Sequence, residues 1–158
     1  MQMSDQRTPE EKLTALGLGL PQLPSPGGNY VPSKRVGDVI YLSGVISAAG
    51  GEVMTGTAGL NRTIEEGYEA ARACTLMHLA VLLWELGSLS RVAEVISVNG
   101  YVNAAPGFGD SPAIVNGASD LLVQLFGEAG RHVRAAVGVS ALPRNALVEV
   151  QMSVRVKA

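Results

Sequence analysis

The chain has 158 residues, of which 47% are hydrophobic and only 16% are charged, and its formal net charge is -2. This length is typical of one domain, and scattered lysines and arginines in a net negative chain exclude the basic stripe that a nucleic-acid surface requires. Because few charges are available to cover the surface, we expect part of it to be covered by other copies of the chain.

The sequence also indicates the cellular compartment and bears on metal binding. Cys74 is the single cysteine, so the chain can form no internal disulfide. The polar first twelve residues lack the apolar segment of a secretory signal, and the longest apolar run, 76–84, is too short to span a bilayer. We expect a cytoplasmic protein without a membrane segment. Two widely spaced histidines, His78 and His132, give no zinc pattern, and we interpret both as structural and Cys74 as an inert core thiol.

The N-terminal region reads as a short helix followed by an extended arm. Thr8 and Glu11 form the pattern of a capping box, with proline at the first helical position, which predicts a helix over 8–17. Four prolines and two glycines in 20–32 then favour an irregular arm. We therefore divide the chain into an N-terminal segment, 1–27, and a main domain, 28–158.

Two further helices are predicted from the capping residues at their ends. Thr63, Glu66 and Gly87 indicate a capped helix over 63–87, apolar nearly all round in its second half. A second helix is predicted over 111–127, with Ser111 as its cap.

Alternating or β-branched segments predict the strands, and a turn over 48–53 predicts a hairpin. The strand segments are 34–44, 91–102, 133–142 and 146–156. The resulting order, β-β-α-β-α-β-β, places two helices on one face of a mixed sheet. The other face is left bare, which again favours an oligomer.

Arg134 is a charge inside an otherwise apolar strand pattern. Strand alternation places Ala136 and Gly138 on its face, and these small residues leave room for a ligand beside the guanidinium. A lone buried charge costs several kcal/mol unless it is paired, so the side chain needs a partner.

Glu149 interrupts the last strand in the same way, and its face also carries Gln151 and Ser153. We expect the last two strands to form a hairpin with Arg134 and Glu149 on one polar face. Two alternatives follow: a structural ion pair across the strands, or a site in which Arg134 binds a small anion.

Three segments carry a family resemblance that extends over roughly 28–157. They read RAAVGVSALPRNALVEVQ, GNYVPSKRVGDVIYLSG and VNGASDLLVQLFGEAG. They resemble the YjgF-like, or Rid (reactive intermediate deaminase), family. The resemblance implies an α+β, chorismate-mutase-like fold, assembled as a homotrimer with a barrel-like centre and a small-molecule cleft at each subunit interface.

The resemblance further implies a reaction without cofactor or metal, in which water hydrolyses an enamine or imine of a 2-keto acid to the keto acid and ammonia. Arg134 would hold the substrate carboxylate through two parallel hydrogen bonds, and Glu149 would orient the water and handle its proton. The resemblance places further substrate-binding residues at Tyr30, Ser43, Gly44 and Asn116.

Three departures from the family pattern concern the substrate rather than the fold. Ala136 stands where the family often has cysteine, Val45 stands where it commonly has glutamine, and the loop 103–112 is longer. Whether the chain is an enzyme stays open. The alternative is a non-catalytic trimer that binds small carboxylates; a ribonuclease is disfavoured by the net negative charge and the lack of a histidine pair.

Overall fold

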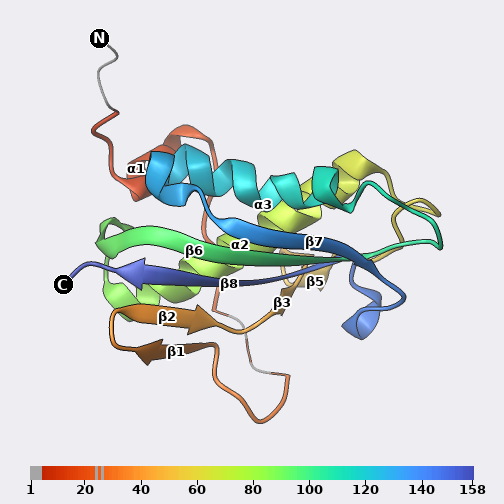
Figure 1. Ribbon diagram of the computed structural model, residues 1–158, viewed down its shortest axis with the longest axis horizontal. Coiled ribbons are helices and arrows are strands. Elements are labelled where there is room, and N and C mark those ends of the chain that lie inside the picture. The colour runs from red at the N-terminus through yellow and green to blue at the C-terminus, as the bar shows by residue number, and fades with distance from the viewer. Residues whose placement is uncertain (1–4, 24, 26) are drawn as a thin grey trace.

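The computed structural model describes residues 5–23, 25 and 27–158, which form a six-stranded mixed sheet with helices on one face and a small two-stranded sheet (Figure 1). Residues 1–4, 24 and 26, which fall in the predicted N-terminal segment and arm, lie outside this part of the chain. In spatial order the strands are β1 (Ser33–Val36), β2 (Val39–Leu42), β8 (Val148–Val156), β6 (Val92–Asn103) and β7 (Val133–Val139), and the short β3 (Val45–Ile46) also pairs with β8.

Strands β7 and β8 do not form the predicted hairpin, because β6 lies between them. Strand β8 is antiparallel to β6, whereas β7 is parallel to it. Helix α3 (Ser111–Phe126) connects β6 to β7, and a strand that returns through such a crossover lies parallel to the first. The two strands are neighbours in sequence only, joined by the turn η3 (Pro143–Asn145).

Helix α2 (Ile64–Leu86) and helix α3 pack on one face of the sheet, as predicted. Thr63 and Glu66 form the expected capping box, and Gly87 ends the helix in the left-handed conformation with φ 78°. Asp110, rather than Ser111, is the cap residue of α3, and Ser111 is its first helical residue. None of the helices in the described ranges has the length and apolarity needed to cross a bilayer.

Helix α1 (Pro9–Ala15) has the predicted capping box and is anchored to the domain by two side chains. The Glu10 carboxylate accepts a hydrogen bond from the Leu89 backbone in η1 (Leu89–Arg91), and Lys12 Nζ donates to the Leu125 carbonyl oxygen at 3.3 Å. Leu13 is only 3% exposed and belongs to the main core.

The region predicted as one strand over 34–44 is a hairpin of two strands. Gly37, with φ 62°, provides the turn between β1 and β2, where few other residues are comfortable. The turn predicted over 48–53 is confirmed as a second hairpin, β4 (Ala48–Ala49) with β5 (Glu52–Val53). A short 3-10 turn, η2 (Gly127–Gly130), leads from α3 into β7.

The face of the sheet opposite α2 and α3 carries no helix in the described part of the chain (Figure 1). Its centre holds polar ladders, in which Ser97 bonds to Ser153 and Asn99 bonds to Gln151. Its margins expose apolar side chains, most of all Val133 at 71%. Apolar side chains left in water at these margins favour association.

Close contact between α2 and α3 depends on Gly117. A Cβ atom there would overlap the Tyr68 carbonyl oxygen of α2 and lie 3.2 Å from the Ala71 side chain. The backbone of a packed helix cannot move away without separating the two helices.

We therefore predict that Gly117→Ala lowers the free energy of unfolding by about 3 kcal/mol, through overpacking. Urea denaturation measures the loss. Gly109→Ala is the matched control, because no atom lies within 4 Å of its Cβ position and its φ is not in the left-handed region. Equal stability of the two variants would contradict this packing.

Candidate functional site

The six predicted site residues fall into two groups in the structure. The first group is built on β7 and α3 and contains Arg134 and Asn116. Arg134 Nη1 donates to Asn116 Oδ1 at 2.8 Å and to Ser119 Oγ at 3.1 Å, and Nη2 donates to the Pro112 carbonyl oxygen at 3.2 Å. Helix α3 therefore fixes the guanidinium in place at the edge of the sheet.

Arg134 is exposed, and part of its donor capacity is unused. A guanidinium has five N–H donors, and the three hydrogen bonds to α3 leave Nε–H and one Nη2–H without an acceptor among the described residues. Two N–H groups of one rigid planar fork match the two oxygens of a carboxylate. The side chain is thus held in position with donors available to an anion.

The second group contains Glu149 and the other three predicted residues, of which Gly44 lies directly against the Glu149 carboxylate. Tyr30 and Ser43 line a surface depression of about 300 Å3. Ser43 Oγ donates to the Val31 carbonyl oxygen at 2.6 Å, which holds the end of β2 against the arm. Gly44 follows directly, and a Cβ there would lie 2.7 Å from Glu149 Oε2. The absence of a side chain at Gly44 makes room for the carboxylate.

The Glu149 carboxyl is half-buried, and this burial raises its pKa above the ordinary value. Removal from water disfavours the charged form of a carboxylic acid. A raised pKa brings the group nearer to neutral pH, where a carboxyl can both accept and return a proton.

The two groups lie on opposite faces of the sheet, so the expected common face for Arg134 and Glu149 is wrong. Arg134 is paired with Val98, which is fully buried under the helices, whereas Glu149 is paired with Tyr101 on the other side. Strand β6 also separates the two residues by about 10 Å perpendicular to the strands, and the three-residue offset from Val98 to Tyr101 adds about 10 Å along them. Within one chain, the side chains do not meet.

The sequence interpretation missed two polar residues beside Arg134. Ser119 accepts from Arg134 and also bonds to His132 Nε2 at 2.8 Å. His132 was interpreted as a structural turn residue. The available signal was its position two before Arg134, which places both side chains on the same side of the strand.

Two other reactive side chains are buried away from both groups. Cys74 is fully buried, and burial raises the pKa of its thiol. His78 is 1% exposed, its Nε2 lies 2.7 Å from the Val150 carbonyl oxygen, and burial lowers its pKa to about 4. Across the described residues, no three histidine, cysteine or acidic side chains come together as a metal site.

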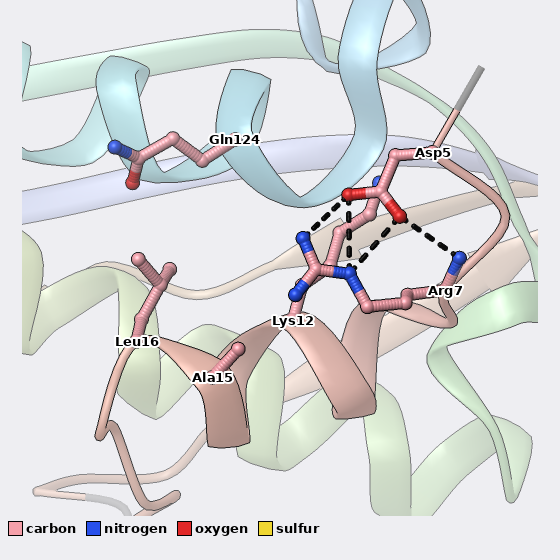
Figure 2. Close-up of a pocket in the computed structure, with 6 residues that line it drawn as sticks. All are labelled: Asp5, Arg7, Lys12, Ala15, Leu16 and Gln124. Carbon is pink, nitrogen blue, oxygen red and sulfur yellow. Dashed lines mark hydrogen bonds and ion pairs between the residues drawn. The ribbon is translucent and has the colours of Figure 1, made fainter. Parts of the chain in front are cut away.

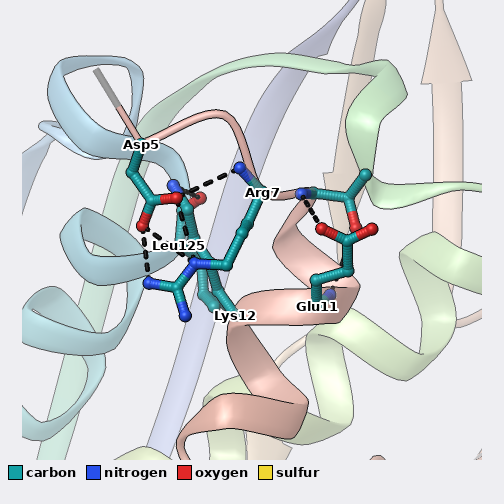
Figure 3. Close-up of polar contacts among 6 residues, drawn as sticks. Asp5, Arg7, Glu11, Lys12 and Leu125 are labelled. Atoms are coloured by element: carbon teal, nitrogen blue, oxygen red, sulfur yellow. Dashed lines mark hydrogen bonds and ion pairs between the residues drawn. The ribbon is translucent and has the colours of Figure 1, made fainter. Parts of the chain in front are cut away.

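A separate depression of about 350 Å3 lies between α1 and α3, away from the predicted residues (Figure 2). Its charged groups already have partners: Arg7 is paired with Asp5 at 2.7 Å, and Lys12 bonds to the Leu125 carbonyl oxygen (Figure 3). Because Arg7 and Asp5 neutralise each other and Lys12 is bonded to the backbone of α3, we assign this depression to the anchoring of α1.

A mixed α+β sheet with α2 and α3 on one face and an uncovered opposite face defines a chorismate-mutase-like fold. The comparison with protein families agrees: residues 10–156 match the family described as "YjgF/chorismate mutase-like, putative endoribonuclease". The chain belongs to this family.

Relatives of known sequence and structure span nearly the whole chain. A Trypanosoma cruzi protein named Protein TCP17 is 43% identical over 140 residues, covering 87% of this chain and 88% of the relative. A Dermatophagoides farinae protein named 2-iminobutanoate/2-iminopropanoate deaminase is 32% identical over 136 residues, covering 85% and 91%. The crystal structure of an Agrobacterium tumefaciens protein of unknown function superposes with a TM-score of 0.88 at 37% identity, covering 96% of this chain and 93% of that chain.

The buried His78 predicts a specific pH dependence of stability. Its pKa falls from 6.5 in the unfolded chain to about 4 in the native protein, so the unfolded chain binds the proton more tightly. Stability is therefore lost as the pH falls from 6.5 to 4, by about 3 kcal/mol. Urea denaturation over this range measures it. His78→Gln, which keeps a donor for the Val150 carbonyl oxygen, should lose this part of the slope; equal slopes would contradict the assignment.

Proposed function

We propose that the chain is a deaminase that hydrolyses imines and enamines of small 2-keto acids, releasing the keto acid and ammonia. The observation that carries the proposal is Arg134: three bonds to α3 fix its guanidinium, and its remaining N–H donors match a carboxylate. The name of the Dermatophagoides relative supports the same chemistry.

One chain does not bring Arg134 and Glu149 to a common ligand, so we propose that the site forms between copies of the chain. The uncovered face of the sheet supports association, because Tyr41, Val133 and Val137 are 52%, 71% and 45% exposed there. In a homotrimer, the edge strand β7 of one copy would bring Arg134 beside Glu149 of its neighbour.

The proposed reaction uses one water molecule and no cofactor. Arg134 and Asn116 hold the substrate carboxylate, and Glu149 accepts a proton from water as its oxygen attacks the imine carbon. The protonated carboxyl then returns this proton to nitrogen, which gives a carbinolamine. Glu149 next moves the hydroxyl proton of the carbinolamine to nitrogen, the C–N bond breaks, and ammonia leaves as the hydroxyl oxygen becomes the carbonyl oxygen of the keto acid. An enamine first takes a proton on carbon to become the imine. The raised pKa of Glu149 suits both proton transfers.

The second candidate is a non-catalytic binding protein for small carboxylates, which the same Arg134 geometry supports equally well. Cleavage of RNA is disfavoured, because His78 is buried in the core and His132 is bonded on both ring nitrogens. The two histidines are held in separate parts of the domain, so they cannot act as an acid–base pair.

Loss of Arg134 should abolish turnover without changing the assembly. With 2-iminobutanoate generated in the assay, Arg134→Ala should reduce kcat/KM at least about 100-fold, because the carboxylate loses charged hydrogen bonds. Arg155→Ala is the matched control, since Arg155 pairs with Glu94 at 2.9 Å outside the site. Full activity of Arg134→Ala would overturn the site.

Glu149→Gln separates the two candidate functions. As general acid and base, Glu149 should contribute about 10²–10⁴-fold to kcat, so Glu149→Gln should lose turnover while still binding 2-oxobutanoate. Calorimetry measures the binding and the coupled assay measures the rate. A binding protein would show no acceleration by the wild type over the uncatalysed hydrolysis.

Mixed assemblies test whether each site uses two chains. Arg134→Ala chains and Glu149→Gln chains, denatured together and refolded as mixtures, should recover roughly a quarter of the wild-type activity, because random pairing in a symmetric ring restores that share of sites. Each variant refolded alone should stay inactive. No recovery in the mixture would place both residues of each site on one chain and contradict the proposal.

A further inference from the structure

His132 links the end of α3 to Arg134 through a chain of hydrogen bonds. Its Nδ1 lies 2.7 Å from the Gly130 carbonyl oxygen, and its Nε2 lies 2.8 Å from Ser119 Oγ. Ser119 Oγ in turn accepts from Arg134 Nη1 at 3.1 Å. The three side chains form one connected path from the η2 turn to the guanidinium.

When His132 is neutral, only one placement of the hydrogens satisfies every hydrogen bond of this path. A carbonyl oxygen can only accept, so Nδ1 carries the hydrogen and Nε2 is left as an acceptor. Ser119 must then donate its hydroxyl hydrogen to Nε2, and its oxygen is free to accept from Arg134. Burial and the charge of Arg134 both lower the pKa of His132, which favours the neutral ring.

If His132 stabilised only the η2 turn, the hydrogen bond from Nδ1 to the Gly130 carbonyl oxygen would be sufficient. The second bond, from Ser119 to Nε2, fixes the hydroxyl hydrogen on the side of the ring, so that the Ser119 oxygen stays oriented to accept from Arg134 Nη1, which also donates to Asn116 Oδ1. Both hydrogens of Nη1 are then used, and the unused donors are confined to Nε and Nη2.

We propose that His132 is a positioning residue: acting through Ser119, it fixes the Arg134 guanidinium so that its Nε and Nη2 donors face a carboxylate ligand. This inference rests on the proposed function of Arg134 as the carboxylate-binding residue. His132 itself does not touch the ligand.

The binding test uses 2-oxobutanoate as the probe and calorimetry on the full chain in its native assembly. Ser119→Ala and His132→Ala should each weaken binding about tenfold, the effect of one lost hydrogen bond to a charged group. The double variant should be no weaker than either single one, because both remove the same path. His132→Gln offers an amide oxygen near the Nε2 position and should restore most of the affinity.

Arg131→Ala is the matched control, because Arg131 is next to His132 but pairs with Glu128 at 3.0 Å outside the path. Wild-type affinity in both Ser119→Ala and His132→Ala, with binding lost in Arg134→Ala, would overturn the inference and leave the proposed function intact. Undiminished binding in Arg134→Ala would instead overturn the proposed function and the inference together.

A second measurement needs no ligand. Nitrogen NMR of the free protein should show His132 protonated on Nδ1 and not on Nε2, and an ordered Arg134 Nε–H group. The Arg134 group should become mobile in Ser119→Ala and His132→Ala and be ordered again in His132→Gln. An Nε2-protonated ring, or an equally ordered Arg134 in all variants, would refute the positioning role even if 2-oxobutanoate does not bind.

Discussion

Backbone hydrogen bonds between β6 and β7 are the interaction on which the rest of the structure depends. They place β7 parallel to β6 at the edge of the sheet, and they leave β8 on the other side of β6. Arg134 consequently points toward α3, where Asn116 and Ser119 bond to it, while Glu149 points away from the helices. A chain in this arrangement keeps the Arg134 group and the Glu149 group apart, on opposite faces of the sheet.

Local sequence signals predicted the elements well because each rests on contacts between near neighbours. The capping boxes at Thr8 and Thr63 located both helix starts, and alternation identified the strands. The β1–β2 hairpin was missed because its turn takes only two residues, Gly37 and Asp38, and so interrupts the strand pattern only briefly. The cap of α3 was misplaced by one residue, since Asp110 and Ser111 are both good cap residues.

The site was predicted less completely, because alternation says which residues share a face but not which face the helices cover. On β7 the residue types do not reveal which face is turned to the core. The apolar Val133 is exposed, whereas the face with the charged Arg134 also carries Ala136, which packs against the core. Sequence proximity of β7 and β8 suggested pairing, yet the partner of a strand is decided by the crossover through α3. His132 was missed because its function, as proposed, depends on a partner that is thirteen residues away on α3.

Because Gly44 lies so close to the Glu149 carboxylate, the residue that is tolerated at one of these positions depends on the residue at the other. Any side chain at position 44 would occupy the space of the carboxylate, but the clash is with the far end of a flexible side chain, so the fold can absorb it by moving that carboxylate. A substitution there would displace the Glu149 carboxylate, the proposed acid and base, while leaving the backbone in place. Laboratory evolution of this pocket therefore has to vary both positions together, and a library that randomises position 44 alone would mostly sample displaced carboxylates.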